Sequence, residues 1–185
     1  GFHTGTGCVI ENSVSAGNRQ YGFFGTTLSK ISGCVAMANT NDGIYVGPNS
    51  IATGNLSGDN GGHGISAGAG SRIEGNLASN NKGDGINVAS DCFVLRNQTS
   101  GNTGAGISGG WGCRVESNHA TSNIGSGVKA MPGSRANLFI GNTAVGNGTN
   151  YVTDPLANFG RITIGGDLGP NFLFSNPPAN FDFTP

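Results

Sequence analysis

Three titratable residues recur along the chain at a fixed interval. Asp42, His63 and Asp84 are evenly spaced, and each is followed directly by Gly and Ile. If residues at this interval stack in space, the two carboxyl groups lie two strand spacings apart, or about 9.6 Å. Inverting glycosidases place their two catalytic carboxyl groups at roughly 6.5–9.5 Å. The three residues are therefore a candidate hydrolytic site, while Asp before Gly is equally ordinary turn chemistry.

The same interval extends through most of the sequence. Five positions agree over four successive repeats, which chance does not produce. Two of these positions hold Asn55, Asn76, Asn97 and Asn118, and Ile65, Ile86, Ile107 and Val128. We expect the earlier repeats to fit with one-residue slips around Asn12 and Gly33. A last repeat near Asn142 fits after a three-residue insertion between Met131 and Ser134.

Each repeat is typical of short strands rather than of a helix. Its apolar stretches are brief, β-branched and bounded by Gly or Asn, without helical spacing. Stacked repeats would pair these strands in parallel, and crossover connections are right-handed as a rule. We predict an all-β fold over residues 1–150, a single-stranded right-handed parallel β-helix of about seven coils of about 21 residues. Residues 151–185 leave the period and predict an irregular cap or assembly arm.

The recurring asparagine has a physical use in such a solenoid. A buried amide at a turn satisfies backbone groups and bonds to the same amide one coil above and below. We predict a structural ladder made of Asn12, Asn55, Asn76, Asn97, Asn118 and Asn142. Cys92 and Cys113 share another position of the repeat and should be neighbours, either as a disulfide or as two buried thiols.

Two segments, Gly83–Val88 (GDGINV) and Arg72–Asn76 (RIEGN), resemble those of a known superfamily. Over residues 1–150 the chain is similar to the right-handed parallel β-helix repeat proteins of the pectin-lyase-like superfamily. That group includes polysaccharide lyases, polygalacturonases, epimerases and phage tailspikes. Segments 39–44, 61–66 and 72–74 resemble polygalacturonase motifs, which implies catalytic roles for Asp42, His63 and Asp84. The sequence lacks the coil with paired Asp residues that polygalacturonases place between the first Asp and the His.

Composition and charge limit the partners. Only 10% of the residues are charged and the net charge is −1, so no basic surface for nucleic acid or for an anionic membrane is expected. No run of 18 apolar residues predicts a membrane span. Without a CxxC pair or a His-Cys cluster we predict neither a metal nor a cofactor. Low charge and 35 glycines favour an extracellular or cell-surface protein.

The two ends of the sequence favour association between copies. Gly1 and Phe2 align with the middle of a coil, and an uncovered parallel edge is a template for stacking. The tail concentrates aromatic residues, among them Phe172, Phe174, Phe181 and Phe183. These features predict self-association through the solenoid ends, with subunits stacking end to end into a filament.

Two classes of function follow from these observations. The first is a non-enzymatic, secreted structural protein that self-assembles. The alternative is a carbohydrate-active protein, either a polygalacturonase-like hydrolase or a glycan-binding module, with a polysaccharide as its partner. A lyase is less favoured because no coil combines several carboxylates with a neighbouring Arg or Lys. Passive glycan binding along a sheet lacks an aromatic stripe in the sequence.

Overall fold

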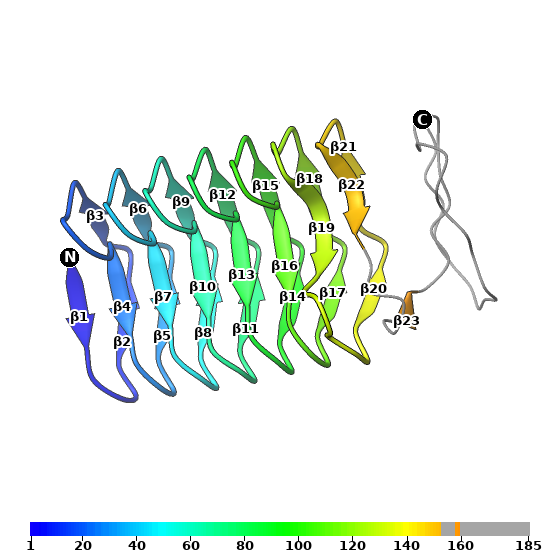
Figure 1. Ribbon diagram of the computed structural model, residues 1–185. Coiled ribbons are helices and arrows are strands. Elements are labelled where there is room, and N and C mark those ends of the chain that lie inside the picture. Colours follow the sequence, from blue (N-terminus) through cyan, green and yellow to red (C-terminus); the bar gives the residue numbers. More distant parts are fainter. Residues whose placement is uncertain (153–157, 160–185) are drawn as a thin grey trace.

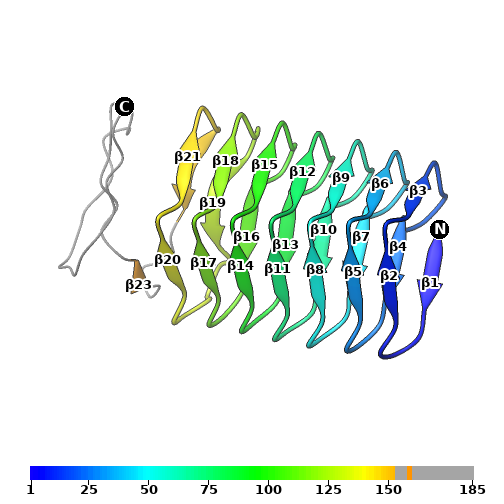
Figure 2. The ribbon, with the colours of Figure 1, turned by 180° about the vertical axis from the view of Figure 1, so that it is seen from behind.

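The described part of the protein consists of short parallel strands in three sheets and of the turns that join them. The computed structural model describes residues 1–152 and 158–159, so most of the predicted cap or arm at 151–185 lies outside the described residues. Figures 1 and 2 show the coils side by side from β1 to β22, with each coil contributing one strand to each sheet in turn. The predicted all-β solenoid is confirmed.

The sheets are named A, B and C in the order in which a coil visits them. Sheet A contains β1 (Phe2–Thr4), β4 (Phe23–Gly25), β7 (Ile44–Val46), β10 (Ile65–Ala67), β13 (Ile86–Val88), β16 (Ile107–Gly109), β19 (Ser126–Ala130) and β22 (Thr149–Val152). Sheet B contains β2 (Val9–Glu11), β5 (Lys30–Ser32), β8 (Ile51–Thr53), β11 (Arg72–Glu74), β14 (Phe93–Leu95), β17 (Arg114–Glu116), β20 (Leu138–Ile140) and β23 (Asn158–Phe159). Sheet C contains β3 (Val14–Ala16), β6 (Val35–Met37), β9 (Leu56–Gly58), β12 (Leu77–Ser79), β15 (Gln98–Ser100), β18 (His119–Thr121) and β21 (Thr143–Val145).

The register of the strands follows the sequence interval without a break at the start. Val9 pairs with Lys30 and Val14 pairs with Val35, at the same interval that separates the residues paired in the middle coils. The slips predicted around Asn12 and Gly33 are therefore wrong. The interval first lengthens where Arg114 pairs with Leu138, which places the three-residue insertion between β19 and β20, as predicted.

The core is a narrow stack of identical layers. In sheet A the two flanking residues of each three-residue strand point inward, whereas in sheets B and C the middle residue does. One column of fully buried residues consists of Phe23, Ile44, Ile65, Ile86, Ile107 and Val128. Burying a side chain of this size stabilises the fold by about 1.5–3 kcal/mol. The repeated Ile position thus supplies a large share of the apolar stabilisation.

Buried asparagines link successive coils at the bend between sheets B and C. Asn76 shows the pattern: its Nδ2 donates to the carbonyl of Ala52 (2.9 Å) and to Oδ1 of Asn97 (3.0 Å). Its own Oδ1 accepts from the backbone N–H and from Nδ2 of Asn55 (2.9 and 3.0 Å). The ladder runs through Asn55, Asn76, Asn97, Asn118 and Asn142.

Asn12 does not belong to this ladder, contrary to the prediction. Cys34 occupies the ladder position in the preceding coil, where its backbone N–H donates to Oδ1 of Asn55 (2.9 Å). Because the register has no slip, Asn12 falls one residue too early, at an exposed bend where its φ is 49°. Asn accepts this left-handed conformation more readily than most residues, which explains its presence there.

A second asparagine ladder, not predicted as such, lies at the turn between sheets C and A. Nδ2 of Asn81 donates to Oδ1 of Asn102 (3.0 Å), and Oδ1 of Asn81 accepts from the backbone and the side chain of Asn60 (3.1 and 2.9 Å). The ladder contains Asn39, Asn60, Asn81, Asn102, Asn123 and Asn147. Asn18 extends the ladder by one coil, since its Nδ2 donates to Oδ1 of Asn39 (2.7 Å), so the ladder fixes the turn before each strand of sheet A from β4 to β22.

The turn between sheets A and B carries small polar side chains in place of asparagine. Oγ of Ser50 accepts from the backbone N–H of Ser29 (2.9 Å), and Cys92 and Cys113 occupy the same column further along. All four cysteines are free thiols in the structure, and these two are buried. A hydrogen bond to Cys113 and burial together raise the pKa of the Cys92 thiol. Cys92 and Cys113 are thus neighbours in one column, and a disulfide between them stays a prediction.

The buried hydroxyl of Thr99 has no hydrogen-bond partner in the described part of the chain, so we expect a substitution that removes it to stabilise the fold. The side chain of Thr99 points inward from β15. Ser57, in the same column, donates to the carbonyl of Gly64 (2.7 Å). A buried unsatisfied hydroxyl costs about 1–3 kcal/mol, so Thr99→Val should raise the free energy of unfolding by about 1 kcal/mol.

Chemical denaturation of Thr99→Val and Ser57→Ala gives the matched comparison. Ser57→Ala removes a satisfied hydroxyl and should lower the free energy of unfolding by about 1 kcal/mol. Equal losses from both substitutions would show that the Thr99 hydroxyl is satisfied.

Candidate functional site

The outer face of sheet A presents one side chain per coil. Because the flanking residues of each strand are inside, the middle residue stands outward. Parallel pairing places these residues in one row along the solenoid. The row consists of His3, Phe24, Tyr45, Ser66, Asn87, Ser108, Lys129 and Val152.

Four rings gather at the beginning of this row and form an aromatic stack. The ring of Phe24 lies parallel to that of Tyr45, with centroids 4.7 Å apart and an interplanar angle of 10°. His3 packs on the other side of Phe24, and Tyr21 contacts both Phe24 and Tyr45 from the preceding turn. The sequence interpretation that no aromatic stripe exists is therefore wrong. The equivalent positions of Phe24 and Tyr45 in successive repeats were the signal that could have identified it.

The structure brings Asp42, His63 and Asp84 together at the turn before three successive strands of sheet A. Oδ1 of Asp42 accepts from the backbone N–H of His63 (2.8 Å), and its Oδ2 accepts from Oγ of Ser66 (2.7 Å). Nδ1 of His63 accepts from the backbone N–H of Asp84 (2.9 Å). The side chains of Asp42 and His63 thus each accept a hydrogen bond from the backbone of the next coil. The acceptor role of Nδ1 places the ring proton of neutral His63 on Nε2.

Asp84 is the most enclosed residue of the column, with 9% of its side chain exposed. Its Oδ1 accepts from the backbone N–H of Ala105 (2.6 Å), and its Oδ2 accepts from Oγ of Ser108 (2.7 Å) and Nδ2 of Asn87 (3.2 Å). Nζ of Lys129 lies 3.8 Å from Oδ1. A carboxylate surrounded by donors in this way is a strong, fixed acceptor. Sequence reasoning missed Lys129.

Glycine is required beside each member of the column. A Cβ atom at Gly62 would clash with Oδ1 of Asp42, and one at Gly104 would clash with Oδ1 of Asp84. A Cβ atom at Gly83 would lie 2.8 Å from Nδ1 of His63, also too close. The repeated Gly of the sequence is therefore the local reason why these side chains fold back onto the next coil.

The column lies at the turns that lead into the row, so the two run side by side along sheet A. Tyr45 and Lys129 bound the middle part of the row, which is four strand spacings or about 19 Å long. Between them the row holds three short polar residues, of which Ser66 and Asn87 are partly exposed and Ser108 is fully buried beneath Asp84 and its neighbours. In the described ranges, no group of three His, Cys, Asp or Glu residues could hold a metal ion. The same ranges contain no helix long and apolar enough to cross a membrane.

The residues predicted for end-to-end assembly are described only in part. The side chain of Phe2 is 46% exposed and stacks on Phe23, with ring centroids 5.2 Å apart. Gly1 is exposed beside it. Phe172, Phe174, Phe181 and Phe183 lie outside the described residues, so self-association stays a prediction.

Three parallel sheets wound by one strand per coil define a parallel β-helix protein. Residues 2–113 match the family described as "right handed beta helix region", and the chain belongs to this family. The solenoid is accordingly right-handed, as predicted. A search of curated proteins gave no match.

Two solved structures show the same fold over most of the chain. The A-module of the Azotobacter vinelandii mannuronan C-5 epimerase AlgE4 aligns with a TM-score of 0.62 and 17% identity, covering 84% of this chain and 58% of that module. The Dettilon tailspike protein aligns with a TM-score of 0.63 and 17% identity, covering 80% of this chain and 37% of the tailspike. The chain thus spans between about a third and three fifths of these proteins, and the similarity shows the fold alone.

Proposed function

We propose that this chain binds a polysaccharide along the outer face of sheet A. The observation that carries the proposal is the continuity of the aromatic stack with the polar row on one regular face. Saccharide sites combine apolar ring faces with a few placed polar groups, because a sugar ring has C–H faces and a rim of hydroxyls. Both kinds of group occur here in adjacent coils.

Tyr45 is the central residue of this proposal. One face of its ring stacks on Phe24, while the next coil carries only the short side chain of Ser66 on the other side. The proposal places a sugar ring against Tyr45 on this second side. Ser66 and Asn87 then offer hydrogen bonds to the hydroxyls of the same chain.

The similar structures support this proposal over the structural role predicted first. One of them is by name an epimerase of mannuronan, a polysaccharide. We also propose that the protein is located outside the cell, where it would encounter polysaccharides. End-to-end assembly remains a separate prediction that does not conflict with it.

Affinity electrophoresis through gels containing single polysaccharides tests the proposal. A panel of neutral and acidic polysaccharides should include at least one that retards the protein in a concentration-dependent way. The same polysaccharide should leave a reference protein of similar size unaffected. Unchanged mobility in every gel would contradict polysaccharide binding.

A second candidate function is cleavage of the bound polysaccharide, with Asp84 as the catalytic carboxylate. The enclosed carboxylate beside Lys129 and His63 favours it, because such groupings serve acid/base chemistry. Asp84→Asn is then expected to reduce the release of reducing ends by about 100-fold or more, with binding retained. Intact polysaccharide after long incubation with the unmodified protein would leave binding alone as the function.

A further inference from the structure

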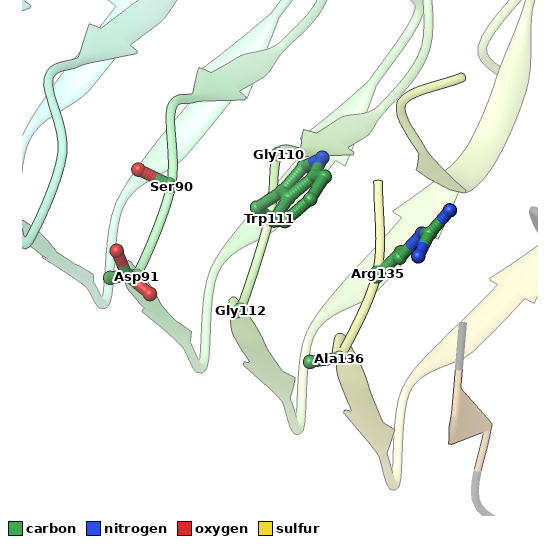
Figure 3. Close-up of a pocket in the computed structure, with 7 residues that line it drawn as sticks. All are labelled: Ser90, Asp91, Gly110, Trp111, Gly112, Arg135 and Ala136. Carbon is green, nitrogen blue, oxygen red and sulfur yellow. The ribbon is translucent and has the colours of Figure 1, made fainter. Parts of the chain in front are cut away.

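A hollow outside the sheet A face contains the exposed side chain of Trp111. Figure 3 shows Trp111 between Ser90 and Asp91 of the preceding coil and Arg135 of the following one. The hollow has a volume of about 550 Å³, within the range of small-molecule sites. It lies at the turn between sheets A and B, at the opposite strand ends from Asp42, His63 and Asp84.

The hollow forms where the repeat is interrupted. The insertion between β19 and β20 lengthens the turn that carries Arg135. In repeat proteins such insertions gather on one face, which is often the binding face. Backbone hydrogen bonds fix both neighbouring turns: the N–H of Asp91 donates to the carbonyl of Trp111 (2.6 Å), and the N–H of Gly112 donates to the carbonyl of Arg135 (3.0 Å). The surroundings of Trp111 are therefore held in place.

The side chains around Trp111 are available for a ligand. Trp111 is 56% exposed. Within residues 1–152, the Asp91 carboxylate and the Arg135 guanidinium have neither an ion pair nor a side-chain hydrogen bond. Gly112 allows the close approach of Asp91, because a Cβ atom there would lie 2.5 Å from Oδ1 of Asp91.

We infer that this hollow is a second saccharide site that takes an uncharged pyranose ring. Trp111 provides the apolar face, Asp91 accepts hydrogen bonds from hydroxyls, and Arg135 and Ser90 donate to ring or hydroxyl oxygens. The charges of Asp91 and Arg135 are opposite and sum to zero, so the hollow has no net positive charge that would favour a uronic acid over a neutral sugar. The inference does not depend on polysaccharide binding at sheet A.

Tryptophan fluorescence reports on this site alone, because Trp111 is the single tryptophan of the sequence. Titration with the methyl glycosides of glucose, galactose and mannose should give a saturable change in emission with at least one of them. Glucuronate and galacturonate should give none. No saturable change with any neutral glycoside, or a change with the uronic acids only, would overturn the inference.

Two substitutions at positions of similar backbone φ separate binding from folding. Asp91→Asn should weaken the fluorescence-detected affinity at least fivefold, because it removes the charged acceptor. Asp59→Asn is the control, since Asp59 has a similar φ (56°, against 58° for Asp91) at a turn outside the hollow.

Arg135→Gln gives a second test if Asp91→Asn lowers the melting temperature. Unchanged affinity in both Asp91→Asn and Arg135→Gln would also overturn the inference. Tyr45→Ala should leave this titration unaltered, which distinguishes the two saccharide sites.

Discussion

Asn76→Ala is expected to lower the free energy of unfolding by about 3–5 kcal/mol. The substitution removes four hydrogen bonds at once, two donated and two accepted by the buried amide. The backbone N–H and the amide of Asn55 lose their acceptor, and the carbonyl of Ala52 loses a donor, in a place that water does not reach. A buried group left without a partner costs about 1–3 kcal/mol, so the losses add to a large fraction of the stability of a small domain.

Equilibrium denaturation of Asn76→Ala beside Asn41→Ala measures this effect. Asn41 is exposed in the turn between sheets C and A, and its side chain makes no hydrogen bond within residues 1–152. Asn41→Ala should therefore change the free energy of unfolding by less than about 0.5 kcal/mol. Similar small effects for both variants would contradict the view that the ladder holds the coils together.

Tyr45→Ala is expected to reduce the affinity for the retained polysaccharide at least tenfold. Aromatic residues at the centre of a binding surface commonly contribute more than about 1.4 kcal/mol, which corresponds to a factor of ten. Tyr45 stands where the aromatic stack ends and the short polar side chains begin, so its loss removes the apolar contact for a sugar ring. Retardation in affinity gels at graded polysaccharide concentrations gives the dissociation constant.

Phe93→Ala is the matched control for Tyr45→Ala. Phe93 is an aromatic residue that is 48% exposed, but it stands on sheet B. Removing it should leave polysaccharide binding within a factor of two. Thermal melting of both variants shows whether the solenoid is intact. Equal loss of affinity in the two variants would mean that the aromatic stack has no special part in binding.

The fold could be predicted from the sequence because every coil repeats the same physical requirements. The inward Ile of sheet A and the amide of the Asn76 position are needed once per coil, so they occur as evenly spaced columns in the sequence. Where the interval changes, at the insertion before Ser134, the sequence also shows it. Asn12 was misplaced because a residue that suits a left-handed bend looks the same as one that belongs to the ladder.

The candidate site was predicted less completely, since its contacts cross from one column to another. Asp42, His63 and Asp84 share a column and could be grouped by spacing alone. Lys129 reaches Asp84 from a different column and from two coils further on, which no regular spacing indicates. The aromatic stack likewise joins Tyr21 of a turn to Tyr45 of a strand. Contacts of this kind depend on the directions of side chains, which only the folded coils define.

The central claim is that a polysaccharide binds along sheet A. NMR chemical-shift mapping tests it most directly: isotope-labelled protein is titrated with short oligosaccharides prepared from the polysaccharide that retards the protein in affinity gels. Binding along sheet A predicts that the largest shifts cluster at Tyr45, Ser66 and Asn87, with smaller ones at His63. Saturable shifts confined to sheets B and C, with the residues of sheet A unchanged, would contradict the account.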